Sequence, residues 1–498
     1  MTLSSLLTRR GWFTTLFLTD MWERFSFYGM QAILILYAVA PPERGGLGLP
    51  VATAAALFGV YFGGVFLLAL PGGWIGDRLL GERRAILWGG IVIALGHLVM
   101  ALPTTAATAP GLVLIAAGTG LLKPNLTSLL SRFYNKDQAI QREAAISVFY
   151  MSIQISALLA PLVTGFLGET VNWHLGFGAA SVGMAFGVIQ FARGRRHFGE
   201  IGAEPVRPAT LNERRRVFRA TSLILLPVAL VLTIDVATGA FSPEHVIIPL
   251  GLLIVLAAPV AFARLYRKPE LDRGERRRLG AILWLFLPSA LFWMLVGQSG
   301  SLLNIFAERH TDRSILGFVF PASWLQSATP LFVLVVAPVF ALVWLRLGAR
   351  FGVRGKFALG MCCAGTSFVL MAAATAASGQ GVVSPLWLLS VFFLHACGEL
   401  LLGPVGISTA SDAAPPAYRG QLIGLWWLFS AMGMGLGSQA VRLADALPVP
   451  LYYAASGLAA LVVAGVLAAF GGRISRTFGY TTAAGQAAPR ALVEGGSR

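Results

Sequence analysis

Residues 19–31 read TDMWERFSFYGMQ and lie within an apolar run from about residue 12 to residue 40. That run is long enough to cross a lipid bilayer as a helix. Side chains at positions i, i+3, i+4, i+7 and i+11 share one face of such a helix: Asp20, Glu23, Arg24, Phe27 and Gln31. Ionisable groups at membrane depth must face a helix bundle or water and find partners. The stretch predicts either a structural pair of Arg24 with Glu23 or Asp20, or, as we favour, part of a polar pathway.

The composition is that of a membrane protein. Hydrophobic residues make up 56% of the 498 residues and charged residues 12%, with a mean hydropathy of +0.73. A soluble chain would carry about a quarter charged residues. The net charge of +16 indicates no nucleic-acid partner, because no basic run is interleaved with aromatic residues on a soluble segment. Cys362, Cys363 and Cys397 lack metal-ligand spacing, and we expect neither a metal nor a cofactor.

Hydropathy divides the chain into about fourteen apolar spans, which predicts an all-α membrane protein. Their approximate limits are 12–40, 50–76, 85–104, 110–132, 143–168, 174–194, 220–240, 246–266, 280–307, 320–346, 356–378, 385–410, 420–442 and 449–472. Lys and Arg gather in alternate loops, and the positive-inside rule places those loops and both termini in the cytoplasm. We expect a multi-pass protein of a bacterial inner membrane.

The seventh and eighth spans carry no charge near their centres and lie between two strongly basic stretches. We interpret them as an inserted peripheral hairpin that joins two six-helix bundles and has no chemistry of its own. Two such bundles that rock about a central site are the repeat architecture of secondary transporters. The expected units are an N-terminal bundle (1–195), a cytoplasmic linker with the hairpin (196–279), a C-terminal bundle (280–475) and a flexible cytoplasmic tail (476–498).

Two further charges of opposite sign lie inside spans of different bundles, Lys123 in GTGLLKPNL and Glu399 in GELLLGP. Lys123 lies about two helical turns from Arg132 at the membrane edge, which makes a functional or paired lysine more plausible than one that snorkels. A buried charge is far more stable when it is paired. We therefore predict that Lys123 and Glu399 pair, at least when the cavity is shut on the cytoplasmic side, and that protonation of Glu399 opens that side.

The loop after the second span reads GGWIGDRLLGERRA, residues 72–85. Its glycines permit close helix approach, and an ordinary basic loop is the simplest interpretation. The pattern G-x-x-G-D-R-x-x-G-x-R nevertheless resembles the loop that marks the major facilitator superfamily. That resemblance implies that Asp77 and Arg78 belong to a latch between cytoplasmic helix ends, which separate when the protein faces inward.

Six stretches together resemble the proton-dependent oligopeptide transporter (POT) family of that superfamily. They are WERFSFYGM (22–30), GGWIGDR (72–78), GTGLLKPN (118–125), FYMSI (149–153), ASWLQSATPLF (322–332) and GELLLGPVGIS (398–408). The resemblance covers both six-helix halves. It implies the major facilitator fold and proton-driven symport of di- and tripeptides or peptide-like zwitterions by alternating access.

The resemblance also implies roles for individual residues. Arg24 and Lys123 would hold the peptide carboxylate, and Glu399 would receive the peptide amine. The remaining expected contacts are aromatic or belong to recognition of the peptide backbone: Tyr28, Tyr61, Trp293, Trp426, Gln154 and Thr329. The expected residues of proton coupling and gating are Asp20, Glu23, Arg24, Lys123 and Glu399.

The sequence departs from the family pattern at several of these positions. The motif E-x-x-E-R begins here with Asp20, an arginine is replaced by Gln31, and a glutamate is replaced by Gly297. Asparagines usual in the family are replaced by Gln154 and Thr329. The resemblance implies that the two missing charges bridge the halves on the outer side and take part in proton coupling. Their joint loss is physically coherent, because either charge alone would be unpaired in the membrane.

Two alternatives stay open beside the proton-coupled peptide symporter. One keeps the fold and transports another amphiphilic metabolite as a weakly coupled or uncoupled exporter or uniporter. The other is a membrane sensor that binds peptides without moving them, although the loops and termini offer no obvious output domain. An enzyme is not expected, because no nucleophile–base pair, metal cluster or phosphate-binding loop is evident. We expect a monomer in the bilayer.

Overall fold

The computed structural model describes residues 11–134, 138–347, 352–415 and 418–477, and residues 478–498 of the predicted tail lie outside these ranges. The first group of helices is α2 (Gly11–Val39), α3 (Val51–Ile75), α4 (Glu82–Met100), α5 (Thr108–Arg132), α6 (Ala139–Gly165) and α7 (Trp173–Gly194). Then come α8 (Leu211–Ala237) and α9 (Glu244–Tyr266). The second group is α10 (Arg273–Val296), α11 (Leu302–His310), α12 (Ala328–Leu347), α13 (Val353–Ala377), α14 (Leu386–Ala413), α15 (Arg419–Ala446) and α16 (Val449–Thr477).

The helices coincide with the predicted membrane spans. Within the described ranges, 12 helical segments are long and apolar enough to cross a membrane. Two further helices of 29 and 28 residues, α2 and α15, coincide with the first and thirteenth predicted spans. The all-α prediction is therefore confirmed.

Two of the predicted spans are less regular than expected. The ninth span is broken after α10 by a 3-10 turn, η7 (Gly297–Gly300), before α11 begins. The tenth begins with another 3-10 helix, η8 (Ala322–Ser327), which leads directly into α12. Between α11 and η8 lies a two-stranded antiparallel hairpin of β1 (Ser314–Ile315) and β2 (Phe318–Val319).

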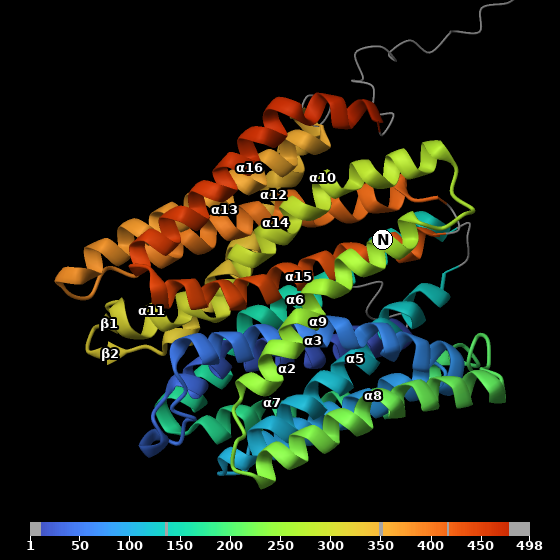
Figure 1. Ribbon diagram of the computed structural model, residues 1–498, viewed down its shortest axis with the longest axis horizontal. Coiled ribbons are helices and arrows are strands. Elements are labelled where there is room, and N and C mark those ends of the chain that lie inside the picture. The colour runs from blue at the N-terminus through green and yellow to red at the C-terminus, as the bar shows by residue number, and fades with distance from the viewer. Residues whose placement is uncertain (1–10, 135–137, 348–351, 416–417, 478–498) are drawn as a thin grey trace, which may run out of the picture.

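Helices α2–α7 pack on one another as the first group, and α10–α16 form the second group (Figure 1). Small residues allow the closest crossings in both groups. A Cβ atom on Gly118 of α5 would lie 2.6 Å from the Gly89 carbonyl oxygen of α4, and one on Gly457 of α16 would lie 2.7 Å from that of Gly365 on α13. Such contacts between small residues are a main source of helix association in membranes. The groups meet along α3 and α15, and where α6 contacts η8 and α12.

The inserted hairpin is only half peripheral. None of the residues of α8, all of which are described, is buried, and α8 runs along the edge of the molecule (Figure 1). In contrast, α9 packs against both α3 and α15 and buries Ile247, Ile254 and Phe262. Thus α9 lies at the junction of the two groups, which differs from the prediction of a purely peripheral pair.

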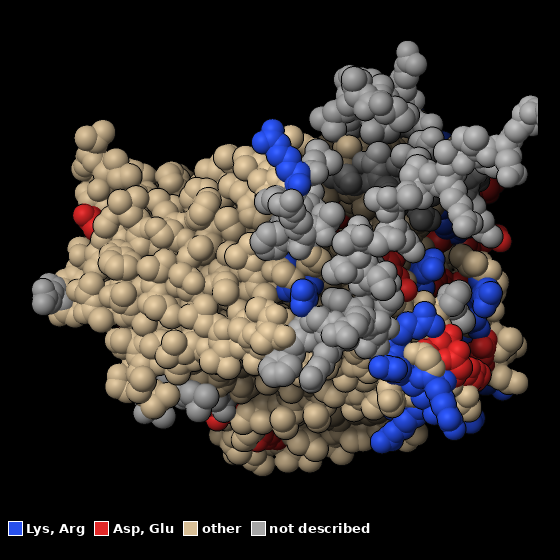
Figure 2. All heavy atoms as spheres, turned by 90° about the horizontal axis from the view of Figure 1, so that it is seen from above, with Lys and Arg blue, Asp and Glu red and all other residues tan. Residues whose placement is uncertain are grey.

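The two ends of the molecule differ in charge. Figure 2 shows Lys and Arg gathered at one end, with few charged side chains over the rest of the visible surface. We call this the basic end; it contains the α3–α4 loop and the α7–α8 connection. The opposite end, which contains β1 and β2 (Figure 1), is called the strand end.

Candidate functional site

The charged stripe of α2 is buried against α6. Glu23 and Arg24 form two hydrogen bonds of 2.5 Å with each other, and both side chains are buried. Asp20 accepts a hydrogen bond of 2.5 Å from the Ser152 hydroxyl of α6. An acid–base pair is therefore present, but it lies within α2 and does not join two helices. Because Glu23 uses Nε and Nη2 of Arg24, the Nη1 edge of the guanidinium is left for another anion.

Lys123 lies between this cluster and the second helix group. Its Nζ is 5.7 Å from the ring centroid of Phe27 and 4.7 Å from that of Phe66, both cation–π contacts. The Phe66 ring in turn stacks on Trp427 of α15 at a centroid distance of 6.4 Å. The charges of the α2 cluster act on the Lys123 ammonium. Within the described residues, Lys123 is thus held by aromatic rings and forms no ion pair with a carboxylate.

Glu399 of α14 faces the first helix group through tyrosines. It accepts a hydrogen bond of 3.1 Å from the hydroxyl of Tyr150 on α6, a residue that is 45% exposed. The charges of Arg24 and Glu399 both act on the Tyr28 hydroxyl. Lys123 and Glu399 form no ion pair with each other in the described structure. The predicted ion pair is therefore absent in this conformation, although Lys123 and Glu399 both lie near the junction of the two helix groups.

Several expected contact residues carry polar atoms without partners. Within the described part of the chain, the buried Tyr61 hydroxyl and the Trp293 Nε1 accept or donate no hydrogen bond. Gln154 is buried and contacts Tyr150, while Thr329 is half-buried. Buried polar groups are normally hydrogen-bonded. Each of these two atoms is therefore left for a partner outside the described chain, such as water.

The Trp426 side chain does not lie at the junction of the two helix groups, where a substrate contact was expected. Its side chain is 1% exposed and packs between Phe286 and Phe357 of its own helix group. Trp427 is 42% exposed and stacks on Phe66 of the other group. Consecutive residues point about 100° apart around a helix, so only one of the pair can face the junction. In this conformation it is Trp427, and the expected role of Trp426 in the site is not supported.

The loop with Asp77 and Arg78 contacts the connection between α7 and α8 and the start of α8, all at the basic end. Arg78 Nη2 donates to both carboxylate oxygens of Glu213 at the start of α8, at 2.7 and 2.8 Å. The Asp77 carbonyl oxygen accepts from the Arg207 amide at 3.3 Å. At Gly76 a Cβ atom would lie 1.7 Å from Asn125 Oδ1, so only glycine fits. The sequence reasoning did not find Glu213, because no motif links it to this loop.

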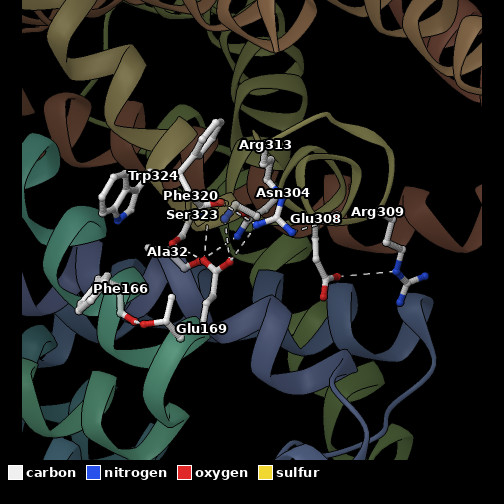
Figure 3. A network of polar contacts seen from close by, with 12 residues as sticks. Ala32, Phe166, Glu169, Asn304, Glu308, Arg309, Arg313, Phe320, Ser323 and Trp324 are labelled. Atoms are coloured by element: carbon white, nitrogen blue, oxygen red, sulfur yellow. Dashed lines mark hydrogen bonds and ion pairs between the residues drawn. The ribbon is translucent and has the colours of Figure 1, made fainter. Parts of the chain in front are cut away.

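At the strand end the two groups are joined by polar contacts (Figure 3). Glu169 lies in η5 (Phe166–Val171), the wide helical turn that ends α6. Its carboxylate accepts hydrogen bonds from the amides of Ala322 and Ser323 and from the Ser323 hydroxyl. The Asn304 side chain donates to the Ala32 carbonyl oxygen at 2.8 Å. The sequence reasoning missed Glu169.

Two groups of membrane helices with buried charges of both signs at their junction define the class of secondary transporters. The family model described as POT family (PTR2) matches residues 83–455. A di-/tripeptide transporter of Lactococcus lactis subsp. cremoris is 36% identical over 91% of this chain and 93% of its own length. The peptide transporter YePEPT of Yersinia enterocolitica is 36% identical over 91% and 92% of the two chains.

Solved structures agree with the sequence comparisons. A crystal structure of a peptide transporter POT in complex with sulfate superimposes with a TM-score of 0.90 at 38% identity, over 94% of this chain and 96% of that chain. A POT family transporter in complex with 5-aminolevulinic acid gives 0.88 at 31% identity, over 93% and 96%. The chain belongs to the POT family, and the predicted major facilitator fold is confirmed. It is accordingly a transporter and not an enzyme.

Proposed function

We propose that this protein takes up di- and tripeptides or peptide-like zwitterions by proton-coupled symport and alternating access. The observation that carries the proposal is the separation of charge across the junction. Arg24 and Lys123 lie on one side, Glu399 lies on the other, and they do not neutralise each other. A zwitterion has the complementary arrangement. Relatives of this chain named di-/tripeptide transporter and peptide transporter support the same substrate class.

In the proposed complex the peptide carboxylate contacts the free edge of Arg24 and the ammonium group of Lys123. The peptide amine contacts Glu399, whose hydrogen bond from Tyr150 leaves the second carboxylate oxygen for another donor. The unpartnered atoms of Tyr61 and Trp293 are placed to bind the peptide backbone. Such a site has few directed bonds to the peptide side chains and aromatic walls, which is compatible with many sequences.

Proton coupling is assigned to the carboxylates of Asp20, Glu23 and Glu399. In the proposed cycle Lys123 and Glu399 approach each other when the basic end closes, since a buried charge is favoured by a partner. Protonation of Glu399 removes that attraction and lets the basic end open. We assign the described conformation to the state open toward the basic end, because Lys123 and Glu399 form no ion pair within the described residues and the strand end is joined by hydrogen bonds.

The proposed orientation places the basic end and both termini in the cytoplasm of a bacterium. The gathering of Lys and Arg at that end (Figure 2) supports it through the positive-inside rule. The proposed units are the N-terminal bundle, the linker with its hairpin and the C-terminal bundle, at the boundaries expected from the sequence. We propose that a monomer is sufficient for transport, since the charged groups of the site all come from one chain.

The test is uptake of alanyl-alanine into liposomes that contain the purified protein and carry an imposed proton gradient. We expect Lys123→Ala and Glu399→Gln each to abolish accumulation, because each removes one pole of the zwitterion site. Asp235→Asn is the control, since its carboxylate contacts His245 in the hairpin, away from the site. Normal proton-driven uptake by either site variant would contradict the proposal.

A second candidate is an uncoupled transporter of another amphiphilic zwitterion. It is favoured by the uncharged contact of Gln31 with Gly300, where a Cβ atom would lie 2.9 Å from Gln31 Cγ. One structural neighbour was solved in complex with 5-aminolevulinic acid, which supports a solute that is not a peptide. Internal acidification that accompanies dipeptide entry supports the symporter, whereas uptake independent of the external pH supports the second candidate.

A further inference from the structure

The contact of Glu169 with η8 brings a charged side chain of the first helix group to the start of a helix in the second group. The carboxylate accepts bonds of 2.7 Å from the Ala322 amide, 2.9 Å from the Ser323 amide and 2.5 Å from the Ser323 hydroxyl. Its side chain is 10% exposed. Within the described part of the chain, every hydrogen bond to this carboxylate therefore comes from the other group.

The donors belong to backbone that would otherwise lack partners. Ala322 and Ser323 are the first residues of η8, which continues into α12 without interruption. The first amides of a helix have no acceptor within the helix, and the aligned peptide dipoles favour a negative charge there. Separation of the two groups at this end leaves these amides without Glu169, and water must replace it.

One cation strengthens the same contact. Arg313 Nη1 lies 3.9 Å from Glu169 Oε2 and also donates to the Phe320 carbonyl oxygen at 2.8 Å (Figure 3). Among the described residues, Arg313 is the charged side chain that acts on Glu169. The carboxylate thus binds both the start of η8 and the segment that precedes it.

Within the described residues, the other hydrogen bonds between the groups at the strand end are uncharged. Asn304 and Gln326 both donate to the Ala32 carbonyl oxygen, and Trp324 Nε1 donates to that of Leu162. The positions of Gln31 and Gly297, also at this junction, carry no charge. Glu169 is therefore the place at which loss of one charge would weaken closure.

We propose that Glu169 is a gating residue of the transport cycle that holds the strand end shut by binding the start of η8. The role of Glu169 in transport rests on the proposed function. Closure of the strand end can be measured without any substrate. In the cycle, solute from outside enters after Glu169 has left η8, and the return of the carboxylate closes the entrance behind it.

The test measures the distance across the strand end by electron paramagnetic resonance in nanodiscs. Spin labels are attached at Thr104→Cys and Ala377→Cys, both exposed and in different groups, after replacement of the three natural cysteines by alanine. In Glu169→Gln, which preserves shape but removes the charge, we expect the ratio of closed to open populations to fall by about tenfold, as for loss of a charged hydrogen-bond set.

Two further variants keep the test decisive. Ser323→Ala removes one donor and leaves both amides, so we expect a shift in the same direction that is smaller than that of Glu169→Gln. Glu308→Gln is the matched control: its carboxylate lies at the same end, pairs with Arg309 at 3.8 Å and does not contact Glu169 (Figure 3). An unchanged distance distribution in Glu169→Gln, or an equal shift in Glu308→Gln, would overturn the proposal. Should Glu169→Gln fail to fold, an unchanged distribution in Ser323→Ala overturns it.

Transport assays separate this proposal from that of the substrate. We expect Glu169→Gln to lower the maximal rate of proton-driven dipeptide uptake more than it changes KM, because the binding residues are untouched. If the distances shift as expected and the wild-type protein does not transport dipeptides, the gating role stands and the substrate assignment is wrong. If the wild-type protein transports dipeptides and the distances in Glu169→Gln are unchanged, the substrate assignment stands and the gating role is wrong.

Discussion

The strand end and the middle of the junction use polar residues in opposite ways. At the strand end, Glu169, Asn304 and Trp324 all bond to the other helix group. In the middle, Arg24 is held within its own helix and Lys123 by aromatic rings, and Tyr61 has no partner within the described chain. Hydrogen bonds between the groups favour closure of the strand end, although Asn304 Oδ1 has no partner within the described chain, whereas the Tyr61 hydroxyl is left for a ligand. The hydrogen-bond partners of a polar residue therefore distinguish the proposed gate, where the partners lie in the other helix group, from the proposed binding site, where they do not.

The largest expected effect concerns the buried pair. Arg24→Ala leaves the Glu23 carboxylate buried without its partner, a change that costs about 3–5 kcal/mol in comparable pairs. We expect a large fall in the melting temperature together with loss of uptake. The double variant Glu23→Gln, Arg24→Gln is the control, since it removes both charges and should recover stability but not uptake. Recovery of uptake in the double variant would show that Arg24 serves structure alone.

The neighbouring tryptophans sharpen the comparison, because they lie in the same span but have different surroundings. Trp426→Ala empties a packed position and should cost about 3–5 kcal/mol of stability. Trp427→Ala removes a half-exposed ring, so we expect a much smaller change in melting temperature and a raised KM for dipeptide uptake. The measurements are thermal unfolding and uptake kinetics of both variants. If Trp427→Ala unfolds the protein while Trp426→Ala affects only KM, the assignment is reversed.

The smallest effect on stability is expected for Tyr61→Phe. The hydroxyl has no partner within the described chain, so its removal should change the free energy of unfolding by less than about 1 kcal/mol. If the hydroxyl binds solute, KM nevertheless rises. Asn304→Ala is the matched variant at the strand end, and it should reverse the pattern through loss of the bond to Ala32. An unchanged KM for Tyr61→Phe removes Tyr61 from the binding site.

Much of the fold follows from sequence because hydropathy directly reports which segments cross a bilayer. The break after Val296 was not predicted, because the polar stretch GQSGS (297–301) is short and lies between two apolar segments, so the whole region was assigned to one span. The charged stripe of α2 was also recognised, but periodicity cannot tell that Glu23 turns to its neighbour Arg24 and not to another helix.

The gate was harder to predict than the binding site. Lys123 and Glu399 stand out as charges in apolar spans, whereas Glu169 lies near the end of a span, where an acid is unremarkable. Its partners are largely backbone amides, which every sequence supplies, so no pairing of side chains indicates the contact. The signal that could have found it is an acid at one span end together with a helix that starts Pro-Ala-Ser at the matching end of another span.

The inserted hairpin also affects how the two groups can move. Ile254 of α9 lies between Gly63 of α3 and Gly435 of α15, where added Cβ atoms would be 2.9 and 3.1 Å from its side chain. The Ile254 side chain fills the space that a Cβ atom would take at both glycines, so a larger residue at either position would push α9 away from that helix. The position of α9 therefore depends on both halves at once, whereas α8 buries no residue and contacts the first group through Glu213 and Arg78.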